Sequence, residues 1–450
     1  LLVDALHEAG GPREALAFAP VADAALGSRL VADARVDQVL LTGGYETAEA
    51  FRSLRPGLRL LAETSGKNAV VVTPSADLDL AARDVAASAF GHAGQKCSAA
   101  SLVILVGQVA RSRRFRDQLL DAVDAMRVGE AWDPTARMGP LIAPAEGKLL
   151  DALTQLGPGE RWVRTPRRLD EAGRLWTPGV KTTVPGSSFH TTECFGPVLG
   201  VLTARDLDEA LAIQNAVPFG LTAGLHSLDA DEVAHWVERV EAGNLYVNRG
   251  ITGAIVRRQP FGGWKRSVVG PGAKLGGPST VLAVSSFRRA QAAHDEPADA
   301  PAAAIVAAFG ARGPEVAAFL RRSAASDRRA WADEYGVVRD ATGLAAERNA
   351  LRYRPVPVTV RAAAGAEPAD VARVVLAGLS ARSVSAGGDA GAKELAVWRQ
   401  RVSQAWPSVA VTHVDASGAG DTPSLGGTMR VRAVVSLGAL NPSDVEVQAL

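Results

Sequence analysis

Two side chains of this sequence have the chemistry and the setting of a covalent catalytic site. Cys97 lies in the segment 90–99 (FGHAGQKCSA), after two glycines and before an apolar run. Glycine lets the backbone approach a substrate closely, and the Cys97 amide is then free to stabilise a developing oxyanion. Because the thiolate is the reactive form of cysteine, the site must lower the thiol pKa or supply a base. The pattern predicts a nucleophile, against the alternative that Cys97 is a buried structural residue, as most free cysteines are.

Glu63 is the candidate for that base. It follows the apolar run 58–62 and precedes a Ser-Gly turn. A carboxylate at the carboxyl end of a strand in an α/β sheet lies where ligands usually bind. Taken alone, Glu63 could equally cap a helix or face solvent.

The segments around both residues alternate between strand and helix patterns, which is typical of an α/β fold with a parallel sheet. Ser75 is a possible N-cap for one of the helices. We predict helices at residues 1–9, 22–34, 46–54, 77–90, 113–126, 207–216 and 230–240, and strands at 36–42, 58–62, 69–73, 102–106 and 245–248.

The composition changes near residue 291. Residues 292–304 are rich in alanine, proline and acidic residues and predict a linker, and helical segments follow to about residue 348. From residue 355 the α/β rhythm returns and indicates a smaller second α/β domain. Its predicted strands are 358–361, 409–413 and 430–435, and its predicted helices are 368–379 and 392–405.

The bulk composition limits the classes of partner. The formal net charge is +1 over 450 residues, without charge runs, so the chain lacks the basic surface that nucleic acid demands. No apolar stretch reaches the roughly 18 residues that span a membrane. Two cysteines are too few for a disulfide framework and favour a cytoplasmic location. The histidines show no metal-ligand spacing, so we expect no metal.

Together, the Cys97 and Glu63 segments resemble the aldehyde dehydrogenase superfamily in pattern, order and separation. The resemblance covers residues 1–288 and implies the aldehyde dehydrogenase fold, with a nicotinamide cofactor, NAD or NADP. It implies Cys97 as the nucleophile and Glu63 as the general base for a small-molecule aldehyde.

Two further motifs carry the cofactor part of the resemblance. Residues 41–44 (LTGG) resemble the family's Phe-Thr-Gly-Ser turn, with a glycine in place of the serine. This implies that Thr42, Gly43 and Gly44 pack on the pyrophosphate. Residues 192–198 (TECFGPV) resemble the Glu-x-Phe-Gly-Pro-Val motif. This implies that Glu193 binds the nicotinamide ribose and that Phe195 lies near the nicotinamide.

Within the superfamily, residues 248–256 (NRGITGAIV) and 259–278 resemble L-glutamate γ-semialdehyde dehydrogenase, also called pyrroline-5-carboxylate dehydrogenase. The resemblance implies that Ser98, Gly253 and Ala254 anchor the substrate's backbone carboxylate and that Phe261 belongs to the same substrate site. A hydroxyl with consecutive amides forms a nest for an anion. The alternatives are a dehydrogenase for another semialdehyde, such as succinate semialdehyde, and a stretch that is only a turn.

Residues 349–355 (NALRYRP) and the pattern after them resemble the C-terminal domain of long bifunctional proline utilisation A proteins. The resemblance implies fusion to a proline dehydrogenase domain and a non-catalytic C-terminal domain. The homo-oligomer that the family implies would exchange a strand at 281–287. The implied domains are residues 1–62, the C-terminal part of an NAD-binding domain; 63–288, a catalytic domain with an oligomerisation segment; 289–348, a linker and helical segment; and 349–450, the C-terminal α/β domain.

A competing motif lies near the end of the chain. Residues 415–421 (DASGAGD) resemble a signature of ribokinase-like sugar kinases. The rest of that fold is not visible in the sequence, so we expect a surface loop there.

The family's Pro-Trp-Asn-Phe segment, which supplies an oxyanion asparagine, does not occur in the sequence, and the chain starts without methionine in a predicted helix. The lysine strand that binds the adenosine ribose does not occur either. We therefore expect a fragment of an NAD-dependent dehydrogenase. It would oxidise L-glutamate γ-semialdehyde to L-glutamate, the second step of proline degradation, through a Cys97 thiohemiacetal and thioester. The alternative from another class is a truncated, inactive structural module.

Overall fold

The computed structural model describes residues 1–21, 23–272, 274–287, 299–363, 365–384, 401, 404–417 and 430–440. The chain forms two compact units. The first unit is Leu1–Arg288 together with Arg339–Leu351, and the second is Arg289–Val338 together with Arg352–Leu450. How the first 288 residues divide into nucleotide-binding and catalytic parts stays a prediction.

A seven-stranded sheet in the order β10-β9-β3-β4-β7-β6-β5 is the centre of the first unit. Its neighbours pair in parallel except β5 and β6, which are antiparallel. Strands β3 and β9 are buried along their whole length, as expected for parallel strands with both faces covered. The strands are β3 (Asn68–Val72), β4 (Ala100–Val106), β5 (Arg161–Arg164), β6 (Gly179–Thr182), β7 (Val198–Ala204), β9 (Thr222–His226) and β10 (Asn244–Val247).

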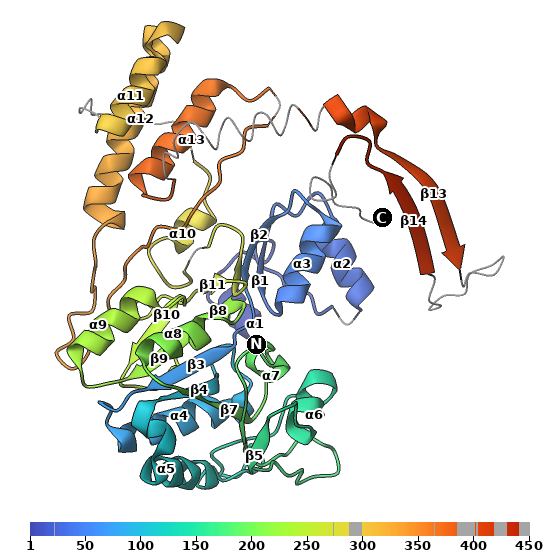
Figure 1. Cartoon of the computed structure of the whole chain (residues 1–450), viewed down its shortest axis with the longest axis vertical. Helices are drawn as coiled ribbons and strands as arrows, with labels where there is room; N and C mark the ends of the chain where they lie inside the picture. The colour runs from blue at the N-terminus through green and yellow to red at the C-terminus, as the bar shows by residue number, and fades with distance from the viewer. Residues whose placement is uncertain are drawn as a thin grey trace. The chain divides into compact units, whose positions relative to one another are not determined.

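Helices cover both faces of this sheet. The chain moves from β3 to β4 in one direction across the sheet and from β7 back to β9 in the other. Because parallel crossovers are right-handed, the connecting helices α4 (Leu78–Phe90) and α8 (Leu207–Asn215) lie on opposite faces. Helix α5 (Arg113–Asp124) packs beside α4, and α9 (Ala230–Arg239) lies beside α8 (Figure 1).

A second, three-stranded sheet has the order β1-β2-β12. Strands β1 (Gln38–Thr42) and β2 (Arg59–Glu63) are parallel, and β12 (Val268–Val269) pairs antiparallel with β2. Their core includes Ala48 on helix α3 (Tyr45–Leu54). The unit also contains the helices α1 (Leu2–Glu8), α2 (Ala24–Ala32), α6 (Gly147–Thr154), α7 (Ser188–Thr191) and α10 (Thr280–Ala283), the short strands β8 (Phe219–Gly220) and β11 (Trp264–Lys265), and the 3-10 turns Gly91–Gly94 and Gly107–Arg111.

The second unit contains the helices α11 (Ala300–Ala308), α12 (Pro314–Ala330) and α13 (Pro368–Ser380). They share a core in which Leu320 and Leu376 are almost fully buried. Arg373 on α13 forms two hydrogen bonds, of 2.7 and 2.9 Å, to the carboxylate of Asp327 on α12. The unit also contains an antiparallel pair of strands, β13 (Ala410–Ser417) and β14 (Arg430–Ser436).

The α/β architecture is confirmed, and the predicted helices and strands of residues 1–248 are present, with ends that shift by at most two residues. The predicted N-cap of α4 is wrong. Asp77, two residues after Ser75, caps the helix by accepting hydrogen bonds from the amides of Asp79 and Leu80. The carbonyl of Ser75 accepts instead from the amide of Leu228.

Two predicted strands are wrong. Residues 281–283 belong to helix α10 instead of a strand. There the amide of Ala283 donates to the carbonyl of Ser279, so a local turn uses the backbone donor that a strand would offer to a neighbour. Residues 358–361 form no strand: Pro355 and Pro357 just before them have no amide proton to extend a ladder, and the Val358 amide donates to the Ser383 carbonyl at 3.0 Å. The strands near 409 and 430 and the helix at 368–379 are confirmed. Residues 392–400 of the predicted helix 392–405, and residues 418–421 of the kinase-like motif, lie outside the described residues; Asp415 lies in β13 rather than in a loop.

Candidate active site

The candidate site draws on the three-stranded and the seven-stranded sheet of the first unit. Glu63 is the last residue of β2, and Cys97 lies in the turn just before β4. Asn68 opens β3 and Thr222 opens β9. Since β4, β3 and β9 are parallel neighbours, their amino ends lie together at one edge of the large sheet. The nucleophile therefore lies at the amino edge of one sheet and the base at the carboxyl edge of the other.

Three consecutive carbonyl groups of the cysteine turn are held by two side chains of the neighbouring strands. The Asn68 amide donates to the carbonyls of Cys97, at 2.7 Å, and Ala99, at 2.9 Å. The Thr222 hydroxyl donates to the carbonyl of Ser98 at 3.3 Å. The Asn68 side-chain oxygen in turn accepts from the Thr222 amide at 3.0 Å. We call Asn68 and Thr222 the carbonyl clamp; it fixes the backbone from which the Cys97 thiol projects.

The carbonyl clamp was not predicted from the sequence. Its signal was an asparagine at the first position of a buried β strand, where an unpaired amide would be costly. Asn68 is 2% exposed, and its donor and acceptor atoms are all used within the clamp. Gly66 has a related function, because a side chain there would begin 2.5 Å from the Cys97 carbonyl oxygen.

The carboxylate of Glu63 is mostly buried, and burial raises its pKa to about 7, against the smaller opposing effects of the Gly263 amide and of Lys274. The Gly263 amide donates to Glu63 Oε2 at 3.2 Å. A carboxylate with a pKa near neutrality is an effective general base at physiological pH, since it exchanges protons readily in both directions. Lys274 itself donates to the carbonyls of Gly243 and Gly262, at 2.6 and 2.8 Å.

The segment between Glu63 and the clamp is anchored by Ser267, which is fully buried. Its hydroxyl donates to the Ser65 carbonyl at 2.6 Å and accepts from the Gly220 amide at 3.0 Å. The Thr64 amide donates to the Ser267 carbonyl at 3.0 Å. Ser267 was also not identified from the sequence, because it is about 200 residues from the segment it fixes.

Burial raises the pKa of the Cys97 thiol; the Ser98 and Cys97 amides lower it by less, and the nearby carboxylates of Glu193 and Glu63 raise it further. The free thiol is therefore the resting form, and the reaction needs a base to remove its proton. Glu63 is near enough to influence Cys97 electrostatically and has the pKa for that task. Both predicted catalytic residues thus belong to one cluster.

Glu193 joins the same cluster. Its Oε1 accepts a 2.7 Å hydrogen bond from the Gly66 amide, and burial raises its pKa. Phe195 has a left-handed backbone, with φ of 59°, and its carbonyl accepts from the Gln95 side chain at 3.3 Å. Cys194, between them, is half-buried and packs against the main core.

Thr42 is the last residue of β1, and Gly43 and Gly44 connect this strand to α3. Gly44 is the N-cap of α3 and offers no side chain to cap it; the amide of Tyr45, the first helical residue, donates to Ser65 Oγ at 3.3 Å, and the positive end of the helix favours an anion. The Glu46 carboxylate lies beside this end: a side chain at Gly44 would begin 3.2 Å from its Oε2. This environment suits a phosphate group, although Glu46 would have to move away to admit one.

The predicted substrate residues lie on three segments. Ser98 is 6% exposed and sits within the carbonyl clamp. Gly253 and Ala254 lie on an exposed loop, where Gly253 adopts φ of +83°, a conformation that favours glycine. Phe261 exchanges two backbone hydrogen bonds with Leu275, of 2.9 and 2.7 Å. Their shared function in substrate binding stays a proposal.

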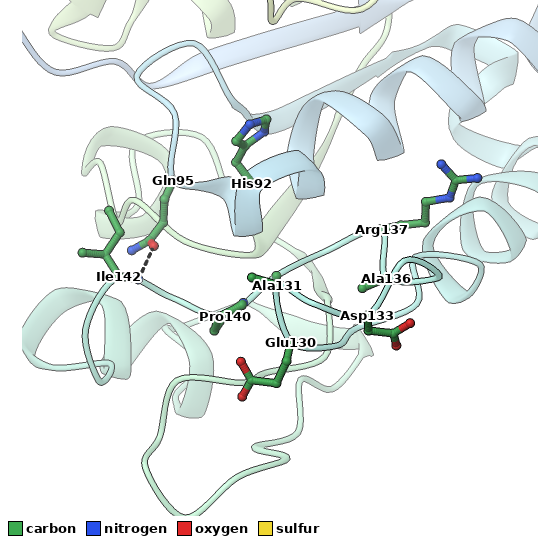
Figure 2. Close-up of a pocket in the computed structure, with 10 residues that line it drawn as sticks. His92, Gln95, Glu130, Ala131, Asp133, Ala136, Arg137, Pro140 and Ile142 are labelled. Atoms are coloured by element: carbon green, nitrogen blue, oxygen red, sulfur yellow. Dashed lines mark hydrogen bonds between the residues drawn. The ribbon is translucent and has the colours of Figure 1, made fainter. Parts of the chain in front are cut away.

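A cavity of about 450 Å³ opens beside the segment that precedes Cys97 (Figure 2). Its walls include His92, Gln95, Glu130 and Arg137, and Gln95 accepts a hydrogen bond from the Ile142 amide at 2.9 Å. Neither Cys97 nor Glu63 lines it. We therefore place the candidate site at the carbonyl clamp and the buried Glu63 carboxylate rather than in this cavity.

In the part of the chain that the structure describes, no group of three or more His, Cys, Asp or Glu side chains is arranged to hold a metal ion. No helix in the same part is both long and apolar enough to cross a membrane.

Comparison with known proteins agrees with this fold. The model of the aldehyde dehydrogenase family matches residues 1–288, well over half of the chain. The chain belongs to the aldehyde dehydrogenase family. A model of the glycogen phosphorylase C-terminal domain matches residues 406–450 only.

Among the relatives, the chain is similar to a 1-pyrroline-5-carboxylate dehydrogenase of Geobacillus sp. (strain WCH70), at 36% identity over 62% of this chain and 55% of that protein. The chain spans about half the length of the curated relatives it matches. Among solved structures, it is similar to 1-pyrroline-5-carboxylate dehydrogenase from Thermus with bound NAD, at 34% identity and a TM-score of 0.56, over 61% of this chain and 54% of that one.

The chain is similar over more of its length to proline utilization A (PutA) from Corynebacterium freiburgense, at 48% identity and a TM-score of 0.73. It covers 82% of this chain and 37% of that chain. Because this coverage exceeds the 288 residues of the family match, the likeness extends into the part of the chain that follows them.

Proposed function

We propose that this chain carries the nucleophile and the general base of an NAD-dependent L-glutamate γ-semialdehyde dehydrogenase. The observation that carries the proposal is the pairing of Cys97, a resting thiol on a clamped backbone, with Glu63, a buried carboxylate whose pKa is about 7. Family membership and the names of the relatives support the reaction class and the substrate.

In the proposed reaction, Glu63 removes the Cys97 proton and the thiolate attacks the aldehyde carbon, giving a hemithioacetal whose oxyanion accepts from the Cys97 amide. NAD, when bound, accepts the hydride whose loss converts the hemithioacetal into a thioester. Glu63 passes the proton it took from Cys97 to solvent, then takes a proton from water, and the resulting hydroxide attacks the thioester carbonyl. The carboxylic acid leaves, and the Cys97 thiolate takes the proton from Glu63 and returns to its resting thiol.

The cofactor and the substrate would use separate parts of the cluster. Thr42, Gly43 and the N-terminus of α3 would receive the pyrophosphate, and Glu193 and Phe195 would face the nicotinamide ribose and ring. Ser98, Gly253 and Ala254 would anchor the substrate's backbone carboxylate, with Phe261 beside them. These assignments follow the family motifs quoted above, and NADP remains an alternative to NAD.

We also propose that this chain works as part of a larger bifunctional assembly. The PutA neighbours support fusion to a proline dehydrogenase domain, which would produce the precursor of this semialdehyde. Residues 349–450 would then be a non-catalytic C-terminal domain, and the whole protein a homo-oligomer.

The test uses the product of the complete reading frame that contains this chain. NAD reduction is measured with L-glutamate γ-semialdehyde, succinate semialdehyde and acetaldehyde, with Cys97→Ala as the control. A preference for the first aldehyde that vanishes in Cys97→Ala is the expected result. Equal rates with all three aldehydes would remove the substrate assignment, and a folded but inactive protein would favour a structural module.

A further inference from the structure

Residues 339–351 return to the first unit after the helices α11 and α12 of the second unit. We call these residues the return loop. Its two ends pair through a bridge in which Arg339 and Leu351 exchange backbone hydrogen bonds of 2.9 and 2.8 Å. Inside, the Asp340 carboxylate accepts from the amides of Thr342 and Asn349, both at 2.9 Å. The Thr342 hydroxyl also donates to this carboxylate, at 2.6 Å, and this bond together with the two amides lowers the pKa of Asp340 to about 2 and gives the loop a defined shape.

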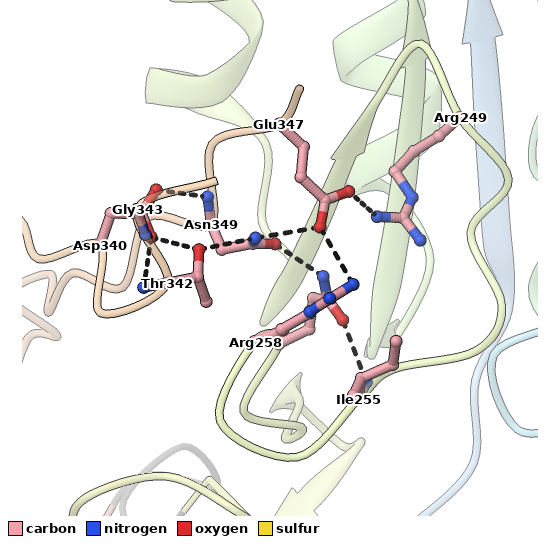
Figure 3. A network of polar contacts seen from close by, with 9 residues as sticks. Arg249, Ile255, Arg258, Asp340, Thr342, Gly343, Glu347 and Asn349 are labelled. Carbon is pink, nitrogen blue, oxygen red and sulfur yellow. Dashed lines mark hydrogen bonds and ion pairs between the residues drawn. The ribbon is translucent and has the colours of Figure 1, made fainter. Parts of the chain in front are cut away.

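The return loop contacts the segment that carries Gly253 and Ala254 (Figure 3). Glu347 pairs with Arg249 at 3.0 Å and with Arg258 at 3.6 Å, so one carboxylate joins the two ends of that segment. Both arginine side chains and Glu347 are between 31% and 43% exposed, so the pairs are partly shielded from solvent.

A second contact reaches the backbone beside the proposed anchor. Asn349 Oδ1 accepts from Gln259 Nε2 at 2.6 Å, and Gln259 Oε1 accepts from the amide of Ile255 at 3.0 Å (Figure 3). Ile255 directly follows Ala254. The Asn349 amide group also donates to Glu347 Oε1 and to Thr342 Oγ1, both at 3.1 Å, which fixes its orientation.

The anchor segment needs such support because it has little of its own. Residues 253–258 are exposed and form neither helix nor strand. Its first end is fixed at Ile251, which is fully buried and whose amide donates to Ser88 Oγ at 3.1 Å. Beyond the return loop, the segment is held by a long 3.4 Å backbone bond from Arg257 to Gly276 and by local turns at Ile255. A nest of amides binds an anion well only if its backbone is already ordered.

We propose that Glu347 and Asn349 are positioning residues, which order the Gly253–Ala254 backbone so that it receives the carboxylate of an amino-acid semialdehyde. This inference rests on the proposed function. It adds that the return loop, which follows the predicted linker in the chain, sets the substrate preference. Glu347 also balances the charges of Arg249 and Arg258, so that these cations are held in place rather than free to pair with the substrate's carboxylate.

The test compares Asn349→Ala and Glu347→Gln with the unchanged protein, all as products of the complete reading frame. Glu347→Gln keeps the shape of the side chain and removes the charge, so it remains informative if Asn349→Ala fails to fold. The matched control is Glu209→Gln, which removes a similar carboxylate–arginine pair, of 2.9 Å to Arg205, on helix α8.

We expect KM for L-glutamate γ-semialdehyde to rise about tenfold in both variants, with kcat and the KM for NAD nearly unchanged. The KM for propionaldehyde, which has no carboxylate to anchor, should stay the same. An equal rise of KM for both aldehydes, or no rise for either, would overturn the inference. Glu209→Gln should change neither constant.

A second measurement needs no turnover and so separates this inference from the proposed function. Amide hydrogen exchange of residues 251–259 should be at least about tenfold faster in Asn349→Ala and Glu347→Gln than in the unchanged protein. Unchanged exchange in these residues would refute the positioning function even if the protein oxidised a different aldehyde.

Discussion

Replacing Asn68 with alanine should separate the stability of the large sheet from the alignment of the nucleophile. The change removes three hydrogen bonds, of 2.7, 2.9 and 3.0 Å, from a residue that is 2% exposed. At about 1 kcal/mol for each bond, the free energy of unfolding should fall by about 3 kcal/mol. Since small misplacements of reacting groups cost about a hundredfold in rate, kcat should fall by about that factor.

The thiol offers a second readout of Asn68→Ala. Burial raises the pKa of Cys97, so a loosened turn should expose the thiol and bring its pKa back toward the ordinary value. Alkylation by iodoacetamide at pH 8 should therefore become faster while kcat falls. The rate is measured in a Cys194→Ala background, because both cysteines are free.

The control for this experiment is Asn215→Ala. Asn215 also bridges two backbone groups, the carbonyl of Arg239 and the amide of Glu241, at 3.0 and 2.9 Å, but on another part of the first unit. It should lose stability without faster alkylation of Cys97. If Asn68→Ala loses stability while kcat stays within about twofold and alkylation is unchanged, the carbonyl clamp serves the sheet alone and our reasoning is refuted.

Three further predictions concern the base, the nucleophile and the lysine beside them. The rate should rise with pH through about 7, where Glu63 loses its proton, and Glu63→Gln should lose the first-turnover burst of NADH together with steady-state turnover, as stopped-flow absorbance would detect, because Glu63 activates Cys97 as well as water. Folding raises the pKa of Glu63 from 4.5 to about 7, so the folded state binds a proton more tightly than the unfolded state does. In urea unfolding, Glu63→Gln should therefore stabilise the protein above pH 7 and leave its stability unchanged near pH 4. The opposite trend would contradict the burial of Glu63. Cys97→Ala should abolish turnover but leave the urea midpoint within error, since the carbonyl clamp contacts only the backbone of this turn. Lys274→Met should lower the free energy of unfolding by about 2–4 kcal/mol, because it leaves buried carbonyls unpaired. It should also shift the rising limb of the pH–rate profile to higher pH, because Lys274 lowers the pKa of Glu63. An unshifted limb would argue against the coupling of Lys274 and Glu63.

Much of the first unit could be predicted from sequence because its signals are local. The apolar run before Glu63 and the periodic segment 77–90 give β2 and α4 within one or two residues. Cys97 and Glu63 were identified because each lies in a short motif with glycines beside it, and the two motifs fix their order. Such patterns need no knowledge of which strands become neighbours.

The contacts that support these residues could not be predicted, because they join distant parts of the chain. Asn68 and Thr222 are 154 residues apart, and Ser267 lies 202 residues from Ser65. Only the order of strands in the sheet brings them together. The strand predicted at 358–361 failed for the opposite reason: its β-branched residues suggested a strand, but the prolines just before it have no amide proton to extend a ladder.

The carbonyl clamp has a consequence for how this site can change. Its hydrogen bonds reach the carbonyls of residues 97, 98 and 99 and none of their side chains. The fold therefore holds the backbone of residue 97 in place whichever side chain this residue carries. Serine or selenocysteine at position 97 would occupy the same place on the same backbone. A single substitution could therefore change the reactive group while the surrounding fold stays the same.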